Sequence, residues 1–207
     1  PDFGRKRRPN GLGMSIATRT KTRPGPRIMN QKDRLIEILR EKSVRTGQFV
    51  LASGKTSDLY VDARQTTLNA EGAYLVAELV LENLHSDIVA IGGPVTGADP
   101  IAGAAAALSW KKGTPIHSFM VRKEAKGHGT QVWVEGQANM PKGSKVCMVE
   151  DTVTTGGSLL TAIQRVEEAG YEVAQTIVVV DRCEGASERL QSAGHEMLAL
   201  VTRRDLV

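Results

Sequence analysis

Aromatic residues and cysteines are scarce in this chain. Phe, Trp and Tyr make up 4% of its 207 residues, and the only cysteines are Cys147 and Cys183. With abundant Ala, Val, Leu and Gly, this composition favours a buried parallel sheet flanked by helices over an aromatic-rich β-sandwich. Neither cysteine has a partner at the spacing of a metal site, and each lies within or beside an apolar run. We therefore expect two reduced packing residues, with no disulfide and no cysteine-bound metal.

Long apolar segments are also missing. The longest runs, near residues 101–108 and 177–180, fall far short of the ~18 consecutive apolar residues that a membrane helix needs. We therefore expect a soluble, cytoplasmic protein with no membrane partner. A length of 207 residues allows one substantial domain, and a second full domain is not expected.

Positive charge is concentrated at the N-terminus. Residues 1–28 contain eight of the 27 Lys and Arg residues and a single acid, so their net charge is +7, whereas the rest of the chain carries −3. This leader lacks both apolar periodicity and the apolar stretch of a secretory signal. Its basic cluster at residues 5–8 could contact a nucleic acid, but such runs are common. A disordered extension before a natural start at Met29 is the favoured interpretation, and no nucleic-acid partner is expected.

Short β-branched runs alternate with helical stretches from Asn30 onward. Helices are expected at 30–44, 69–84, 100–108, 158–169 and 186–193, and strands at 49–51, 59–61, 88–91, 116–121, 131–134, 145–149, 176–180 and 197–201. This alternation predicts an α/β fold with a mostly parallel central sheet flanked by helices. Residues 29–207 would form one domain. Its first part, residues 29–68, does not fit the alternation and is expected to form a small N-terminal hood.

The segment most informative about function is 145–158, KVCMVEDTVTTGGS. Its pattern predicts a strand, two adjacent acids at the strand's carboxyl end, a Thr/Gly loop and the start of a helix. Ligands of open α/β sheets bind at the carboxyl ends of strands. Loop residues 154–158 would offer backbone N–H groups and hydroxyls at a helix N-terminus to a phosphate. Glu150 and Asp151 would accept hydrogen bonds from sugar hydroxyls. Together they predict a ribose 5-phosphate site.

The same residues could form an ordinary strand, turn and helix, with capping hydroxyls and two solvated acids. A glycine-rich turn alone is a weak signal, but an acid pair followed by this Thr/Gly pattern is more specific. The chain has neither the lysine of a Walker A loop nor a G-x-G-x-x-G fingerprint. Nucleoside triphosphate and dinucleotide sites are therefore disfavoured.

At these residues the chain resembles the type I phosphoribosyltransferase family, whose signature is this acid pair and phosphate loop. The resemblance covers nearly all of residues 29–207, and further segments narrow it to the orotate enzymes. Residues 122–129, RKEAKGHG, look like the mobile catalytic loop of that subfamily, although such a run taken alone is typical of a solvated hairpin. Arg182 follows the next strand, and the hood segments 53–57 and 60–62 also match.

The resemblance implies an activity. The phosphoribosyl group of 5-phosphoribosyl 1-pyrophosphate (PRPP) would be transferred to orotate, giving orotidine 5′-monophosphate and pyrophosphate, in de novo pyrimidine biosynthesis. Mg²⁺ would be the cofactor, held mainly through substrate oxygens and water, with no dedicated protein ligands. The family pattern also implies a homodimer in which the catalytic loop is shared between subunits.

The resemblance assigns PRPP to one continuous stretch and to the loop. The acid pair would bind the ribose diol and residues 154–158 the 5-phosphate, so the contacts in this stretch would be Glu150, Asp151, Thr152, Val153, Thr154, Thr155, Gly156, Gly157 and Ser158. The pyrophosphate would be bound by Arg122, Lys123, Lys126 and His128. Three residues would be catalytic: Lys126 with the largest effect on rate, His128 and Asp151. The turn at residues 92–97 looks like the family's pyrophosphate-facing loop.

Orotate itself would be bound by Arg182, through charge-assisted hydrogen bonds, and by Thr154. Some orotate enzymes carry lysine where this chain has Ala52 and Thr96. Lys55 is expected to replace the first of these as a contact to PRPP. The acid pair is Glu-Asp where the family pattern is Asp-Asp, which retains two carboxylates.

Two rival functions stay open. A phosphoribosyltransferase for a purine base would keep the acid pair and the phosphate loop, but not the 122–129 loop or Arg182. A non-catalytic regulator that binds PRPP and controls RNA or DNA would need a nucleic-acid surface on the folded body, whose net charge is −3.

Overall fold

The computed structural model describes residues 30–50, 56–124 and 132–207. Within these ranges the centre of the fold is a six-stranded sheet with the order β5-β4-β3-β6-β7-β8. The strands are β3 (Ala90–Pro94), β4 (His117–Val121), β5 (Val134–Glu135), β6 (Lys145–Val153), β7 (Glu172–Asp181) and β8 (Leu198–Thr202). Neighbours pair in parallel, except β4 and β5, which are antiparallel. The predicted α/β fold with a mostly parallel sheet is confirmed.

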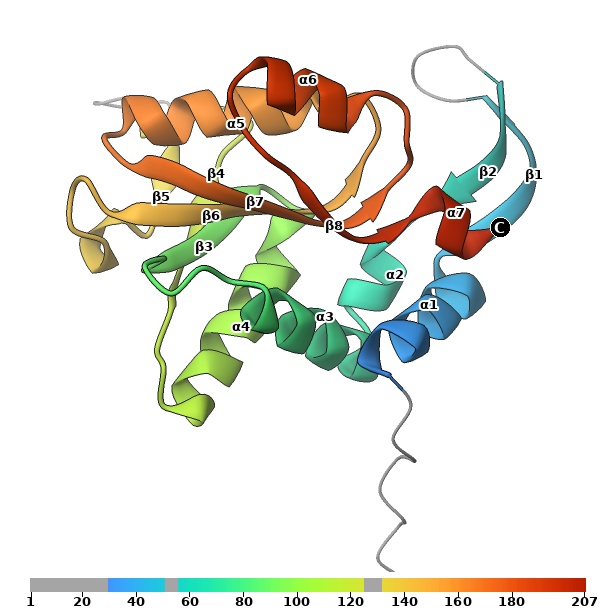
Figure 1. The fold of residues 1–207 in the computed structure, drawn as a ribbon, viewed down its shortest axis with the longest axis horizontal. Helices are drawn as coiled ribbons and strands as arrows, with labels where there is room; N and C mark the ends of the chain where they lie inside the picture. The colour runs from blue at the N-terminus through green and yellow to red at the C-terminus, as the bar shows by residue number, and fades with distance from the viewer. Residues whose placement is uncertain (1–29, 51–55, 125–131) are drawn as a thin grey trace, which may run out of the picture.

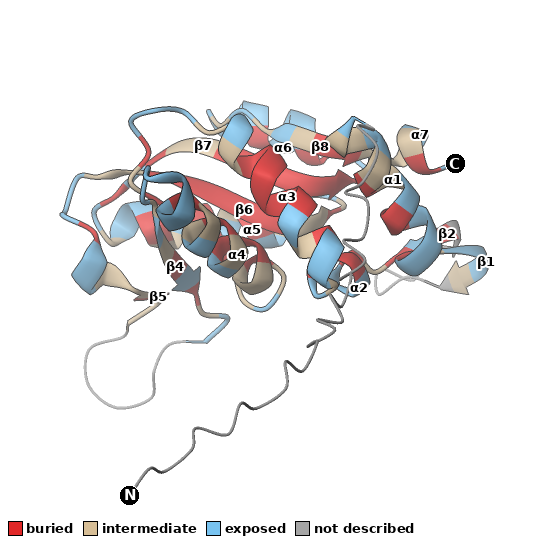
Figure 2. Ribbon diagram, turned by 90° about the horizontal axis from the view of Figure 1, so that it is seen from below, coloured by how far each residue is buried: buried red, intermediate tan, exposed pale blue. Residues whose placement is uncertain are grey.

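Helices cover both faces of this sheet (Figure 1). One layer contains α1 (Gln31–Lys42), α3 (Ala70–Glu82) and α4 (Ala98–Lys112), and the other contains α5 (Gly157–Glu168) and α6 (Ala186–Ser192). Strand β6 serves both layers because successive side chains of a strand point to opposite faces. Cys147 and Val149 pack with the first layer, and Val146 and Met148 with the second. Figure 2 shows the resulting buried interior, which includes most of β6 and α3.

The residues predicted to form the hood fold into α1, an antiparallel pair of strands and the short helix α2 (Arg64–Thr67). Strand β1 (Val44–Val50) pairs with β2 (Thr56–Val61) in a sheet of their own. Arg182, just beyond β7, donates a hydrogen bond to the carbonyl of Leu59 over 3.2 Å. This bond joins β2 to the carboxyl edge of the main sheet, and so places the pair of strands β1 and β2 beside that edge.

The first helix is shorter than predicted. Helix α1 begins after its N-cap Asn30, as expected, but it ends at Lys42, and Val44 opens β1 opposite Val61. A β-branched residue suits the pleated strand pair better than a last helical turn. The hydroxyls of Ser43 and Thr66 lie 2.7 Å apart in the interior and fix this change of direction.

Several other boundaries differ from the sequence prediction. Strand β6 continues four residues beyond 149, so that both acids belong to the strand itself. The extended segment expected at 131–134 is reduced to β5, and residue 131 lies outside the described ranges. The short helices α2, η1 (Gln137–Asn139) and α7 (Arg203–Leu206) were not predicted. The leader 1–28 also lies outside the described residues. In the parts of the chain that are described, no helix is both long and apolar enough to cross a membrane.

Candidate active site

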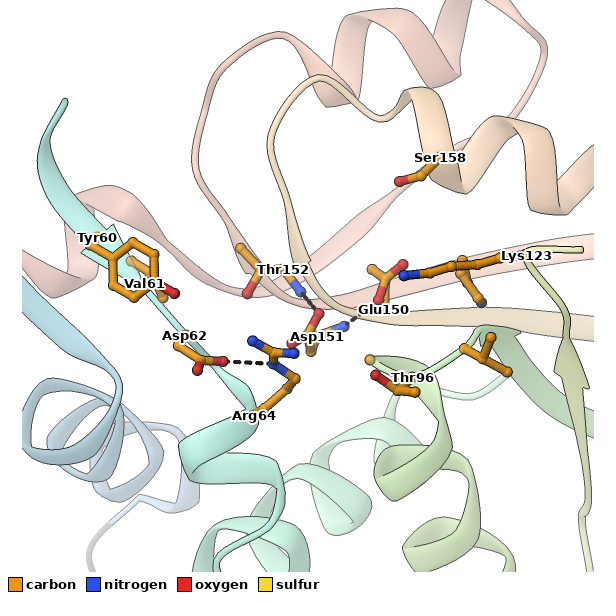
Figure 3. A pocket seen from close by; sticks show the side chains of 13 residues that line it. Tyr60, Val61, Asp62, Arg64, Thr96, Lys123, Glu150, Asp151, Thr152 and Ser158 are labelled. Carbon is orange, nitrogen blue, oxygen red and sulfur yellow. Dashed lines mark hydrogen bonds and ion pairs between the residues drawn. The ribbon is translucent and has the colours of Figure 1, made fainter. Parts of the chain in front are cut away.

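The carboxyl edge of the sheet opens into a cavity of about 320 Å³ (Figure 3). Four separate parts of the chain form its walls: the end of β2 with α2, the turn after β3, the residues after β4, and the end of β6 with the first turn of α5. The lining residues are Tyr60, Val61, Asp62, Arg64, Pro94, Val95, Thr96, Gly97, Lys123, Glu150, Asp151, Thr152 and Ser158. The fold thus brings the acid pair, the turn at 92–97 and the start of the predicted catalytic loop together.

Glu150 and Asp151 form one wall of this cavity. Glu150 is only 8% exposed. The Asp151 N–H donates to Glu150 Oε1 over 3.2 Å, and the Thr152 N–H donates to Asp151 Oδ1 over 2.7 Å. Burial raises the pKa of both carboxyl groups, and the adjacent acid raises the pKa of Glu150 further. Two desolvated carboxylates side by side gain stability from a ligand that brings hydroxyl donors or positive charge.

Gly97 allows the turn after β3 to approach the acids. A Cβ atom at Gly97 would stand 2.6 Å from Asp151 Oδ1 and nearer still to Glu150 Oε1. Only glycine permits such an approach of the backbone. The turn also contains a cis peptide bond between Val95 and Thr96. The segment that resembles the pyrophosphate-facing loop therefore lies directly against the acid pair.

Arg64, at the start of α2, lines the cavity and was not predicted as a site residue. Its Nε donates to Asp62 Oδ1 over 2.8 Å, and its guanidinium points toward Asp151 (Figure 3). The hydrogen bond that Arg64 donates to Asp62 raises the pKa of Arg64, and the charge of Arg64 partly opposes the rise in the pKa of Asp151 that burial causes. The spacing of Asp62 and Arg64 indicates a local ion pair, but nothing in the sequence places Arg64 at the cavity.

The turn from β6 into α5 has the shape of an anion cradle. Gly156 adopts a left-handed conformation with φ +73°, and a Cβ there would meet Leu190 Cδ1 at 2.7 Å. Helix α5 begins at Gly157, and the next residue, Ser158, lines the cavity. The free N–H groups of this helix terminus suit a phosphate. Arg189 of α6 lies beside the same turn, with Nη1 3.3 Å from where a Cβ of Gly157 would be.

The predicted catalytic loop is described only through its first three residues. Lys123 extends into the cavity toward Glu150 (Figure 3), and its charge partly opposes the rise in the pKa of that carboxyl that burial and Asp151 cause. Arg122 does not line the cavity, because its Nε and Nη2 both lie 2.8 Å from Glu135 Oε1 on β5. Lys126, His128 and Lys55 lie outside the described residues.

The two residues predicted to bind orotate lie side by side, next to the cavity. Val153 pairs with Asp181, so Thr154 and Arg182 each follow the paired ends of β6 and β7. Arg182 is 4% exposed, and its Nη2 lies 2.9 Å from Glu184 Oε1. Neither Thr154 nor Arg182 is among the residues that line the cavity. The structure therefore places Thr154 and Arg182 together, but at the margin of the cavity.

The donor set at this edge fits a magnesium ion held mostly by oxygens that do not belong to the protein. Among the described residues, no three His, Cys, Asp or Glu side chains gather in a way that could hold a metal. The cavity offers the carboxylates of Glu150 and Asp151 instead. A hard cation that keeps several waters and takes ligands from a substrate needs no more than such a pair.

Known proteins share this architecture. The phosphoribosyl transferase domain family matches residues 64–193. The orotate phosphoribosyltransferase of Nostoc sp. is 42% identical over 179 residues, which cover 86% of each chain. That of Bradyrhizobium diazoefficiens is 46% identical over 164 residues, covering 78% of this chain and 88% of the relative.

Solved structures of phosphoribosyltransferases are similar to this chain in fold. A Mycobacterium tuberculosis orotate phosphoribosyltransferase in complex with Fe(III) dicitrate is 38% identical, with a TM-score of 0.73 over 85% of this chain and 98% of that one. The same enzyme in complex with PRPP is 34% identical, with a TM-score of 0.68 and the same coverage. An adenine phosphoribosyl transferase from Trypanosoma brucei, 13% identical with a TM-score of 0.63, shares the fold.

The matched domain and the fold place the chain among the phosphoribosyltransferases. The curated relatives narrow this class, because they match most of the chain at 42% and 46% identity: the chain belongs to the orotate phosphoribosyltransferase family.

Proposed function

We propose that this chain transfers the phosphoribosyl group of PRPP to orotate, forming orotidine 5′-monophosphate and pyrophosphate in pyrimidine biosynthesis. One observation carries the proposal. The acid pair of β6, the turn at 94–97 and the first turn of α5 face a single cavity at the carboxyl edge of the sheet. A sugar with a phosphate at one end and a pyrophosphate at the other could contact all three at once.

We assign the substrate groups to the walls of this cavity as follows. Glu150 and Asp151 accept hydrogen bonds from the ribose hydroxyls, and the backbone of residues 154–158 holds the 5-phosphate. The turn at 94–97 and Lys123 face the pyrophosphate. Arg182 and Thr154, at the margin of the cavity, hold orotate. Arg64 is a further cation for the anionic substrates, because it points into the cavity from the hood side.

The reaction is a displacement at the ribose C1 atom. Orotate N1 loses its proton to solvent and donates an electron pair to C1 as the bond from C1 to the pyrophosphate oxygen breaks, with inversion at that carbon. Negative charge develops on the leaving pyrophosphate, so cations held in place lower the barrier. Lys123 is one of these cations, and Arg122, Lys126 and His128 are assigned to the same task from the family pattern.

Three further properties complete the proposal. When bound, Mg²⁺ would neutralise charge on the pyrophosphate, held by substrate oxygens and water near Glu150 and Asp151. The active assembly is a homodimer, because in the family the loop that starts at residue 122 reaches into the neighbouring subunit's site. The enzyme works in the cytoplasm, which agrees with two free thiols, Cys147 and Cys183.

The proposal is tested by a spectrophotometric assay with orotate, PRPP and Mg²⁺. Loss of orotate absorbance that depends on all three components is the expected result. Omitting Mg²⁺, or replacing it by Ca²⁺, tests the metal, and sedimentation at assay concentrations tests the dimer. Turnover of adenine or guanine in place of orotate would point to the purine rival. PRPP binding without turnover of any base, together with RNA or DNA binding, would point to the regulator.

A further inference from the structure

The segment that carries Lys123 is held in place where it leaves β4. The backbone N–H of Arg122 donates to the carbonyl of Trp133 over 2.9 Å, so the chain leaving β4 and the chain entering β5 are tied together. The side chain of Arg122 is held as well, by the ion pair with Glu135. Two residues on one side of segment 125–131 and two on the other thus form a stem, defined here as Arg122, Lys123, Trp133 and Glu135.

Arg165 attaches this stem to helix α5. Its Nη1 donates to the carbonyl oxygen of Arg122 over 2.6 Å, and its Cζ lies 3.8 Å from the centroid of the Trp133 ring. One side chain therefore contacts both sides of the stem. The planar guanidinium of arginine can stack on an aromatic face while its N–H groups donate within its plane. An ammonium group cannot make both contacts in this way.

Helix α5 is also the helix whose first turn lies at the proposed phosphate site. Ser158 lines the cavity, and Arg165 follows seven residues later, about two turns further along the same helix. The residue bonded to Arg165 directly precedes Lys123, which points into the cavity toward Glu150. A single rigid element therefore sets the distance between the phosphate turn and the backbone from which Lys123 extends.

We propose that Arg165, with Trp133 as its stacking partner, is a positioning residue for the transfer reaction. It fixes the backbone at Arg122, so that Lys123 meets the pyrophosphate while the 5-phosphate lies at the other end of α5. This inference rests on the proposed function, because it assigns Lys123 to the leaving group. Arg165 itself does not line the cavity.

The decisive experiment is a double-mutant cycle between Arg165 and Lys123. Arg165→Ala should lower kcat by about tenfold or more, because a small misplacement of a catalytic group is costly, and should leave the KM for orotate unchanged. In a Lys123→Ala background, Arg165→Ala should have little further effect, since the group it positions is gone. Equal losses in both backgrounds would overturn the proposal, because they would indicate a general structural role.

Conservative and control variants separate geometry from charge. Arg165→Lys retains the charge but cannot both stack and donate, and is expected to be as slow as Arg165→Ala. Full activity of Arg165→Lys would contradict the proposal. Arg34→Ala is the matched control, because Arg34 also forms short ion pairs, to Glu37 and Glu71, and none of these residues lines the cavity. It should retain wild-type kcat.

A fluorescence signal reports on the stem without any turnover. The chain has two tryptophans, and Trp110 is 76% exposed on α4, so Trp110→Phe leaves Trp133 as the sole emitter. In that background Arg165→Ala should shift the Trp133 emission to longer wavelength and reduce its response to added PRPP. An unchanged emission spectrum and an unchanged response to PRPP would contradict the positioning role. Because this readout does not involve orotate, a failure of the proposed base specificity would be seen separately, in the turnover assay.

Discussion

Gly97 and Asp151 lie close together in the wall of the cavity: a Cβ atom at position 97 would stand 2.6 Å from Asp151 Oδ1. The contact joins the turn after β3 to the end of β6. In the proposed reaction these two segments hold the pyrophosphate and the ribose of the same molecule. Their separation therefore decides whether PRPP fits, and it depends on the absence of one methyl group.

Replacing Gly97 by Ala is expected to lower kcat/KM for PRPP by about a hundredfold, because a shift near 1 Å in a substrate-holding group can cost that much. The fold should persist, since carboxylate side chains at a cavity wall can move. Gly103→Ala is the control: it lies on α4 with nothing within 4 Å of its Cβ position, and alanine is the better helix former. That variant should keep full activity and gain slightly in Tm. Normal PRPP kinetics in Gly97→Ala would contradict the assigned contact.

Asp151→Asn tests the role of the acid pair. Asparagine keeps the shape of the side chain but loses the charge, so hydrogen bonds from the ribose hydroxyls weaken. We expect PRPP to bind at least tenfold more weakly, with little change for orotate, measured by calorimetry with each substrate separately. Equal weakening for both substrates would refute the diol role. Asp87→Asn, which breaks an exposed ion pair with Lys145, should change neither affinity.

The main sheet could be predicted because β-branched runs alternate along the chain with helical stretches. The acid pair and the phosphate turn could be placed for the same reason, since a strand followed by a helix fixes where the intervening residues lie. The boundary after Lys42 could not be predicted. Val44 fits the apolar side of a helix in the sequence, and only pairing with Val61 draws it into β1.

The contacts of individual arginine side chains could not be predicted from the sequence. Arg64 reaches the cavity because α2 turns it there, and Arg122 faces Glu135 because β5 pairs with β4. Both contacts join residues through packing that no local pattern encodes. Arg182 was predicted from its position after a strand, but its ion pair with Glu184 and its bond to the hood became visible only in the fold.

Arg64→Ala should raise the KM for PRPP by about tenfold, because a cation pointing into the cavity is lost. Arg64→Lys keeps the charge without the forked geometry and should recover part of the affinity. Asp62→Asn should have a smaller effect of the same kind, since Asp62 orients Arg64 through the 2.8 Å bond. Steady-state kinetics over a range of PRPP concentrations measure all three. A wild-type KM for PRPP in Arg64→Ala would show that Arg64 does not contribute to PRPP binding.

Lys126→Ala tests the catalytic loop assigned from the family pattern. We expect kcat to fall by a factor of about a hundred or more, because a charge that stabilises the leaving group only in the transition state affects kcat directly. Thermal unfolding should be unchanged within about one degree, because the role assigned to Lys126 is in catalysis and not in packing. Lys111→Ala, on an exposed part of α4, is the control with wild-type kinetics. A near-normal kcat for Lys126→Ala would show that the loop is misassigned.

Glu150→Gln should stabilise the unliganded protein, and more so at high pH. Burial and the charge of Asp151 raise the pKa of Glu150 in the folded chain above its ordinary value. The folded state therefore holds the proton more tightly than the unfolded state, and stability falls as pH rises above the ordinary carboxyl range. Glutamine stays neutral at every pH, so Glu150→Gln does not lose this stability.

The Tm of Glu150→Gln should exceed that of the wild type by a few degrees at pH 8, since each kcal/mol is worth about 2–4 °C in a chain of this size. The difference should shrink toward pH 4.5. A pH-independent difference for Glu150→Gln would rule out the ionisation as its cause.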